Sequence, residues 1–210
     1  PIFSKLIKEK KSVVPVSWLS FKLIYFFALI ICVTVWTYKV EIIHWRYEIN
    51  GSLLLHSSET FGWLIISFIA VSCNYIFGTL LTAKGSMKQL NILAVFGILI
   101  NISLNLLLIP DKGSSGAAFA SAFTQFFILA FQIALCYKIF NFKSSLLSII
   151  QISSFSLLFI LLVYTIENNL NINWLEKIVL NIIGGGIIGL FLKVVNWKQF
   201  YNLIKHDKSS

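Results

Sequence analysis

The sequence predicts an all-α polytopic membrane protein, and three observations carry that prediction. Hydrophobic residues make up 58% of the chain and its mean hydropathy is +0.85, well beyond a soluble globular domain. Charged residues make up only 12%, which is too few to cover a soluble protein of 210 residues. Several apolar runs reach roughly twenty residues, the length that crosses a bilayer as an α-helix. We therefore expect a chain that crosses a membrane several times.

Six runs are candidates for membrane-spanning helices. In chain order they cover residues 21–38, 61–81, 90–109, 117–139, 146–166 and 178–195. Residues 39–60 alternate polar side chains with short apolar groups, so we expect short helices along the membrane interface there and no span. The chain is accordingly divided into a basic segment over 1–16, a six-helix membrane region over 17–195 and a basic tail over 196–210.

The lysines indicate how these spans are oriented. With six spans, 13 of the 17 basic residues fall on one side of the membrane. The other side receives Lys39, Arg46, Lys112 and Lys177. Short loops rich in lysine face the cytoplasm, so both ends of the chain are expected to be cytoplasmic. The same rule predicts that positions 86, 141 and 205 are cytoplasmic and that positions 50, 113 and 170 are external.

Several classes of function are disfavoured by what the sequence lacks. The net charge is +9, but the positive charges flank apolar runs, so membrane lipids are the expected partner and nucleic acid is not. The cysteines and histidines have no metal-ligand spacing. There is no catalytic triad, no pair of carboxylates within a span and no nucleotide motif. We expect no enzyme activity, no catalytic residues, no metal and no cofactor.

Two glycine-containing segments predict close helix packing. Residues 91–132 hold two apolar runs joined by Ile-Pro-Asp-Lys-Gly, and Pro110 is expected to end the first helix because proline cannot continue one. Gly116 opens a series of small residues four apart, which lets two membrane helices approach backbone to backbone. Gly185 and Gly189 are also one turn apart and are expected to form a packing or bending face.

The first of these segments carries a resemblance to a known family. It reads Asn101-x3-Asn105-Leu-Leu-Leu-Ile-Pro-Asp-x-Gly-x2-Gly-Ala-Ala-x-Ala-Ser. This resembles a signature of the polysaccharide flippases, which belong to the superfamily that also holds the multidrug and toxic-compound exporters and the lipid II flippases. The sequence departs from the signature at Asp111, where the family more often has a basic residue. The resemblance implies the C-terminal lobe of a two-lobe flippase, without the first lobe and the first helix of the second.

The same resemblance implies a function. The expected substrate is a polyprenyl-diphosphate-linked oligosaccharide, moved across the bacterial cytoplasmic membrane by alternating access for surface-polysaccharide assembly. The missing first lobe is an expected partner, and a polysaccharide polymerase is a candidate partner. A cation-coupled multidrug exporter of the same superfamily, a membrane-embedded enzyme of polysaccharide assembly and a membrane scaffold without transport activity remain as alternatives. The enzyme should show clustered catalytic Arg, His or Asp, whereas this chain has one arginine.

Amide and hydroxyl side chains within the spans are the first candidates for substrate binding, since polar groups in a bilayer need a partner or a water-filled cavity. Asn101 and Asn105 share one helix face, Ser121, Gln125 and Gln132 share a face of the next helix, and Asn74 lies on the span before. These side chains either line a cavity that binds sugar hydroxyls or hold neighbouring helices together.

Two basic residues complete the candidate site. Lys22 stands at the mouth of the first span, where it either binds an anionic lipid headgroup or extends its amine to the membrane surface. Arg46 is the single arginine and therefore the one group able to bind a diphosphate with two parallel hydrogen bonds. The alternative for Arg46 is a solvated side chain or one paired with a glutamate.

Overall fold

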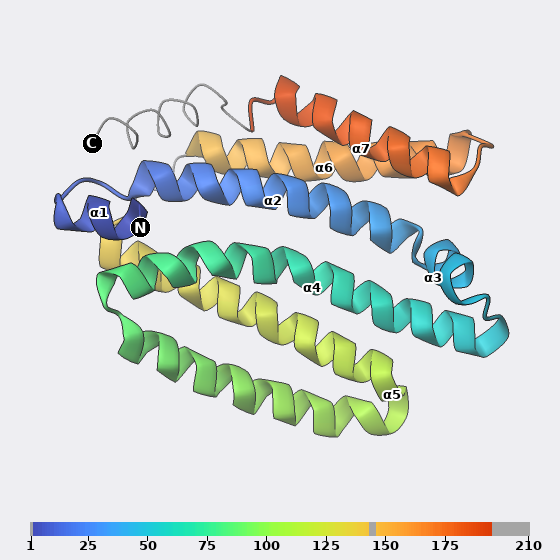
Figure 1. Cartoon of the computed structure of the whole chain (residues 1–210), viewed down its shortest axis with the longest axis horizontal. Helices are drawn as coiled ribbons and strands as arrows, with labels where there is room; N and C mark the ends of the chain where they lie inside the picture. The colour runs from blue at the N-terminus through green and yellow to red at the C-terminus, as the bar shows by residue number, and fades with distance from the viewer. Residues whose placement is uncertain (1, 143–145, 195–210) are drawn as a thin grey trace.

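The described part of the chain is built from helices. The computed structural model describes residues 2–142 and 146–194, and no strand occurs among them. The helices are α1 (Ile2–Lys8), α2 (Val14–Thr37), α3 (Lys39–Tyr47), α4 (Gly51–Lys84), α5 (Met87–Phe140), α6 (Leu146–Asn169) and α7 (Trp174–Phe191). Helix α2 lies between the α4–α5 pair on one side and the α6–α7 pair on the other (Figure 1).

Five of these helices are long and apolar enough to cross a membrane: α2, α4, α5, α6 and α7. Helix α5 has 54 residues, and its backbone reverses at Gly113, whose φ of 55° and ψ of −132° are not helical. The two limbs of α5 run back along each other (Figure 1). Each limb is long enough to cross a bilayer at 1.5 Å per residue. Counting the limbs separately gives six passes, as the sequence predicts.

The prediction for residues 39–60 is half right. Helix α3 is short, as expected, but the residues that follow it are not a second interfacial helix. Helix α4 begins at Gly51, ten residues before the predicted Phe61, and continues unbroken for 34 residues. Its first turns hold Ser, His, Glu and Thr, which a helix tolerates wherever water can reach them. Hydropathy predicts only the apolar part of a helix. Helix α4 begins before its apolar part does.

The ends of two further helices also differ from the prediction. Pro110 does not end the first limb of α5, because the helix continues to Lys112 and the reversal falls at Gly113. Pro110 lies two residues before the end of this limb, so the hydrogen bond that its missing amide hydrogen cannot make is lost close to the reversal and leaves the rest of the limb helical. Helix α7 begins at Trp174 instead of residue 178, because the Asn173 side chain accepts a hydrogen bond from the Leu175 amide at 3.2 Å and caps the helix.

The predicted close packing of the hairpin is confirmed at Gly116. A Cβ atom at this position would lie 2.6 Å from the carbonyl oxygen of Leu108, so the two limbs touch backbone to backbone just after the reversal. Ala118, Ala120 and Ala122 follow as buried small residues along the same limb. Gly113 itself needs glycine for a different reason, since its positive φ combined with an extended ψ strains any other residue.

The glycine face of α7 also packs closely, against side chains instead of a second backbone. A Cβ at Gly185 would lie 2.7 Å from Phe159 of α6 and 2.9 Å from Ile30 of α2. A Cβ at Gly189 would overlap the ring of Phe26 on α2. These large side chains therefore fill the space that the glycines leave, and they hold the α6–α7 pair against α2.

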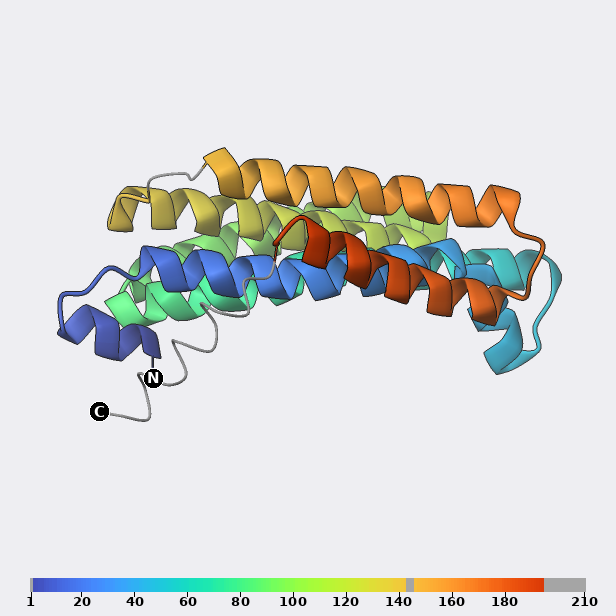
Figure 2. The same cartoon turned by 90° about the horizontal axis from the view of Figure 1, so that it is seen from above.

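The turns between helices gather at two opposite ends of the molecule. Helix α1, the α4–α5 turn and the end of α5 lie at one end, and α3, the Gly113 reversal and the α6–α7 turn lie at the other (Figures 1 and 2). The first end carries most of the described lysines, so the segregation of charge that the sequence predicts has a spatial counterpart. We call these the basic end and the outer end. The predicted basic tail over 196–210 lies outside the described residues.

Exchange of Gly116 for alanine should destabilise the chain, with Gly186→Ala as the control. The added Cβ at Gly116 meets the Leu108 backbone, so we expect a loss of roughly 1–3 kcal/mol, as in other overpacked sites. At Gly186 nothing lies within 4 Å of the added atom, and alanine favours the helix. Melting temperatures of the two purified variants in detergent compare these effects, and equal melting temperatures would contradict the close backbone contact.

The orientation is testable with single cysteines, at positions chosen by exposure. Ser86 is buried and Gly113 has a positive φ, so neither of these predicted positions suits a cysteine. The native Cys32, Cys73 and Cys136 are buried and free, and alanine replaces them in the background.

We expect an impermeant thiol reagent to label Asn50→Cys, Asp111→Cys and Leu170→Cys in intact cells. Met87→Cys and Lys138→Cys should react only after permeabilisation, because they lie at the basic end. All five native side chains are exposed, so access to the reagent depends on the side of the membrane. Labelling of Met87→Cys and Lys138→Cys from outside would reverse the orientation.

Candidate functional site

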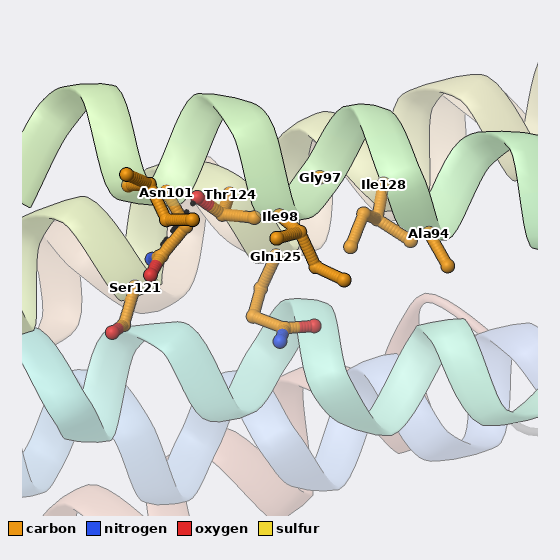
Figure 3. A pocket seen from close by; sticks show the side chains of 9 residues that line it. Ala94, Gly97, Ile98, Asn101, Ser121, Thr124, Gln125 and Ile128 are labelled. Atoms are coloured by element: carbon orange, nitrogen blue, oxygen red, sulfur yellow. Dashed lines mark hydrogen bonds between the residues drawn. The ribbon is translucent and has the colours of Figure 1, made fainter.

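An open pocket of about 430 Å³ lies between the two limbs of α5. The residues that line it, most of which are labelled in Figure 3, are Ala94, Gly97, Ile98, Asn101, Ile102, Ser121, Thr124, Gln125 and Ile128. The first limb contributes residues at spacings of three and four, and so does the second limb. Each set therefore forms one face of its helix, and the pocket occupies the place where the two faces meet.

The limbs come close beside the pocket because of Gly97. A Cβ at this position would lie 2.9 Å from the side-chain methyl of Ile128 on the opposite limb. One turn further along, Asn101 takes the position facing Thr124, and its side-chain nitrogen donates to the Thr124 hydroxyl at 3.4 Å. The Thr124 hydroxyl in turn donates to the carbonyl of Ala120 at 2.8 Å. Polar atoms thus bridge the hairpin at the wall of the pocket.

Asn105 extends this chain of hydrogen bonds without lining the pocket. Its side-chain nitrogen donates to the Asn101 side-chain oxygen at 3.0 Å, one helical turn away. Its own side-chain oxygen is buried and has no hydrogen-bond partner. Asn101 and Asn105 therefore lie on one face, as predicted. They bond to each other, and Asn101 also bonds to the neighbouring limb and lines the pocket.

Asn74 joins the site from α4. Its side-chain nitrogen donates to two oxygens of Gln125, the backbone carbonyl and the side-chain Oε1, each at 3.1 Å. This pair of bonds fixes the Gln125 side chain at the edge of the pocket, on the side that faces α4 (Figure 3). Gln125 thereby connects α4 with the second limb of α5. The Asn74 side-chain oxygen is buried and unpartnered.

Three of the predicted residues lie elsewhere. Gln132 lies on the second limb of α5 outside the pocket and is buried against Gly78 of α4. Its side-chain oxygen has no hydrogen-bond partner. Lys22 on α2 donates to the Oε1 of Gln151 on α6 at 2.7 Å, and Gln151 donates to the carbonyl of Leu192 at 3.2 Å. The lysine thus ties α2 to the α6–α7 pair.

Arg46 is exposed on α3 at the outer end, with its guanidinium 5.4 Å from the centre of the Tyr47 ring. The pocket therefore contains Asn101, Ser121 and Gln125 among the predicted residues. Substrate binding by any of the eight predicted residues stays a prediction.

Sequence reasoning missed Thr124, which is buried and bonds across the hairpin. The signal was available, since Thr124 follows Ser121 by three residues and precedes Gln125 on the same face. A threonine hydroxyl within a helix usually bonds to a carbonyl of the same helix. Its presence in a span therefore does not by itself predict a contact with another helix. The apolar lining residues could not be found in the same way, because isoleucine on a membrane helix is uninformative.

Comparison with known proteins bears on the fold. No family model matches the sequence, and no curated protein matches it. Among solved structures, the lipid II flippase MurJ in its inward closed conformation is similar, with a TM-score of 0.74 and 17% sequence identity. The chain shares its fold with MurJ. The match covers 95% of this chain and 42% of MurJ, so the chain spans less than half the length of that protein.

The likeness to MurJ confirms the fold class that the sequence predicts. The chain has the all-helical, multi-pass membrane fold that the sequence predicts. At this level of sequence identity the likeness concerns the fold alone and does not identify a substrate.

The hydrogen bonds from Asn74 should contribute measurably to stability. We expect Asn74→Leu to destabilise the chain by about 0.6–2 kcal/mol, the range found for polar contacts between membrane helices. Thr79→Val on the same helix is the control, because the Thr79 hydroxyl bonds to the carbonyl of Tyr75 within α4. Melting in detergent measures both variants. If Asn74→Leu proves no less stable than Thr79→Val, Asn74 does not tie α4 to α5.

Proposed function

We propose that this chain forms part of the second lobe of a flippase for polyprenyl-diphosphate-linked oligosaccharides. The transporter moves its substrate outward across a bacterial cytoplasmic membrane for assembly of surface polysaccharides such as O-antigen, capsule or exopolysaccharide. The observation that carries the proposal is the pocket of α5, where amide and hydroxyl groups are presented within an otherwise apolar membrane hairpin of MurJ-like fold. The hairpin signature supports the polysaccharide branch of the superfamily.

The chemistry of the pocket suits a sugar headgroup. Sugars lose hydrogen bonds to water when they enter hydrocarbon, and each loss is costly unless a protein group replaces it. Asn101, Ser121 and Gln125 offer donors and acceptors that are neutral, as sugar hydroxyls require. The volume of about 430 Å³ falls within the range of roughly 300–1,000 Å³ typical of small-molecule pockets. The lipid tail stays in the bilayer throughout.

The pocket is open, which supports a second lobe as its partner. Alternating access requires two walls that rock against each other around the substrate, and the described helices provide one. A match to 42% of MurJ leaves room in a protein of that length for a second wall. A polysaccharide polymerase on the external side would consume the substrate once it is released.

The alternatives fit the pocket less well. A cation-coupled drug exporter needs a group that binds its coupling cation, commonly a carboxylate within the membrane. None of the residues that line the pocket is acidic. A membrane-embedded enzyme would need an activated nucleophile or an acid–base pair. Ser121 and Thr124 are the hydroxyl groups in the lining, and no basic or acidic side chain stands among the residues beside them.

Replacement of Gln125 by methionine tests the proposal in cells. Gln125→Met keeps the length of the side chain but removes the amide from the pocket, and Asn74 retains its bond to the Gln125 backbone carbonyl. Introduced at the chromosomal gene, this change should leave the protein level normal while surface polysaccharide falls several-fold and lipid-linked precursor accumulates. Immunoblots and quantification of both glycans provide the measurement.

Gln132→Met is the matched control, because this glutamine lies on the same limb outside the pocket. It should preserve export in proportion to the protein level. Ala118→Leu, which overpacks the hairpin, should lower protein and export together. Normal export by a normally abundant Gln125→Met protein would remove the pocket from consideration as the sugar site.

A further inference from the structure

Two amide side chains of the pocket are held by residues that lie outside it. The side-chain oxygen of Asn101 accepts a hydrogen bond from the Asn105 nitrogen at 3.0 Å. The Oε1 atom of Gln125 accepts a hydrogen bond from the Asn74 nitrogen at 3.1 Å. Neither Asn105 nor Asn74 is among the residues that line the pocket. In both pairs the outer asparagine takes the oxygen of the amide, so the nitrogen is the end that stays available to a ligand.

The available groups of the pocket are mostly hydrogen-bond donors. An amide nitrogen carries two N–H groups, and Asn101 uses one of them on the Thr124 hydroxyl. The Nε2 atom of Gln125 and the hydroxyl of Ser121 have no partner in the described part of the chain. The Thr124 hydroxyl is already used, because it accepts from Asn101 and donates to the Ala120 carbonyl.

The remainder of the lining is apolar and uncharged. Hydrocarbon side chains come from both limbs of α5, namely Ala94, Ile98, Ile102 and Ile128. A carboxylate or a phosphate would accept from the donors of the pocket, but no lining residue could neutralise its charge, and the loss of its hydration would be costly. A hydroxyl needs an acceptor for its own hydrogen. The group that fits best is a neutral acceptor that carries a small apolar substituent.

We infer that the pocket of α5 binds the acylamino group of an amino sugar. The carbonyl oxygen of that group accepts from the free N–H groups of Asn101 and Gln125, and its methyl group lies against the isoleucines. Asn105 and Asn74 are positioning residues, which touch the two amides and not the ligand. The inference rests on the proposed function for the assignment of a sugar ligand, and it adds the substituent that the pocket recognises.

The buried oxygens of the two positioning residues agree with this assignment. The side-chain oxygens of Asn74 and Asn105 are buried and have no hydrogen-bond partner, which is rare in folded proteins. With the opposite amide orientation, each oxygen would face the NH2 group of Gln125 or Asn101, and the pocket would lose that donor. The observed orientation therefore keeps donors free in the pocket while it leaves an acceptor unsatisfied on each outer asparagine.

Binding of simple glycosides tests the inference on the protein expressed from its own gene and purified into lipid nanodiscs. The probes are methyl N-acetylglucosaminide, methyl glucoside and methyl glucuronide, titrated by saturation-transfer NMR. We expect the N-acetyl glycoside to bind at least about tenfold more tightly than the glucoside, because the glucoside leaves donors of the pocket unpaired. The glucuronide should bind most weakly. Saturation should be strongest at the acetyl methyl protons.

Variants of Gln125 test the donors directly. Gln125→Glu replaces the NH2 group by an oxygen without changing the size of the side chain, and it keeps an oxygen for the bond from Asn74. It should abolish the preference for the N-acetyl glycoside. Gln125→Met removes the amide without adding a charge, and it should give the same loss should the carboxylate prevent folding. Gln132→Met, outside the pocket, is the control and should keep the full preference.

Asn105→Leu tests the positioning role. Without the bond from Asn105, the Asn101 amide is free to turn its oxygen into the pocket. The preference for the N-acetyl glycoside should therefore fall several-fold, while the affinity for the glucoside stays the same. A merely structural role would lower the amount of folded protein and leave the ratio of the two affinities unchanged, which would overturn the assignment of Asn105.

A preference that Gln125→Met abolishes and Gln132→Met keeps would support the inference. Equal binding of the N-acetyl glycoside and the glucoside, tighter binding of the glucuronide, no binding of any glycoside, or a preference that survives in Gln125→Met would overturn it. The export assay of Gln125→Met in cells separates this failure from that of the proposed function. Without a preference among glycosides, loss of export in Gln125→Met would leave the proposed function standing, whereas normal export would remove both.

Discussion

The backbone contact between Gly116 and Leu108 is the constraint on which the candidate site depends. Within a bilayer, lipid tails are as apolar as leucine, so helices associate through close packing and hydrogen bonds instead of escape from water. The contact sets the distance and the register between the two limbs of α5. With that register, Asn101 meets Thr124 and the faces that line the pocket oppose each other. A small shift of one limb would separate these polar groups.

Glycine serves the two halves of the chain in different ways. In α5 it lets two backbones touch, whereas in α7 it makes room for Phe26 and Phe159. The first arrangement leaves space for polar side chains beside the contact, and the second fills the interface with aromatic rings. Helix α2 contacts both halves, and Lys22 fastens it to α6 near the basic end. The α6–α7 pair is therefore held to α2 by Lys22 near the basic end and by the contacts of Gly185 and Gly189 further along.

The sequence predicted the fold class and the number of passes because hydropathy reports directly on the solvent around a helix. It misplaced the start of α4 and the end of the first α5 limb, because helices continue into water and through a proline in their last turn. Periodicity grouped Ser121, Gln125 and Gln132 on one face correctly. It could not tell which part of that face meets the opposite limb and which meets α4, since this depends on tertiary packing. For the same reason the sequence alone could not show how far Lys22 and Arg46 lie from the pocket of α5.

Several buried polar atoms of the described residues have no hydrogen-bond partner, and two of them lie beside the pocket. In a membrane such an atom costs on the order of 1–3 kcal/mol, so packing elsewhere must offset it. Other polar groups that connect helices are paired, as in the Lys22–Gln151–Leu192 chain. The side-chain oxygens of Asn74 and Asn105 beside the pocket have no partner, and neither has the side-chain oxygen of Gln132 outside it. Beside the pocket, the close contact of Gly97 with Ile128 adds packing that helps to offset this cost.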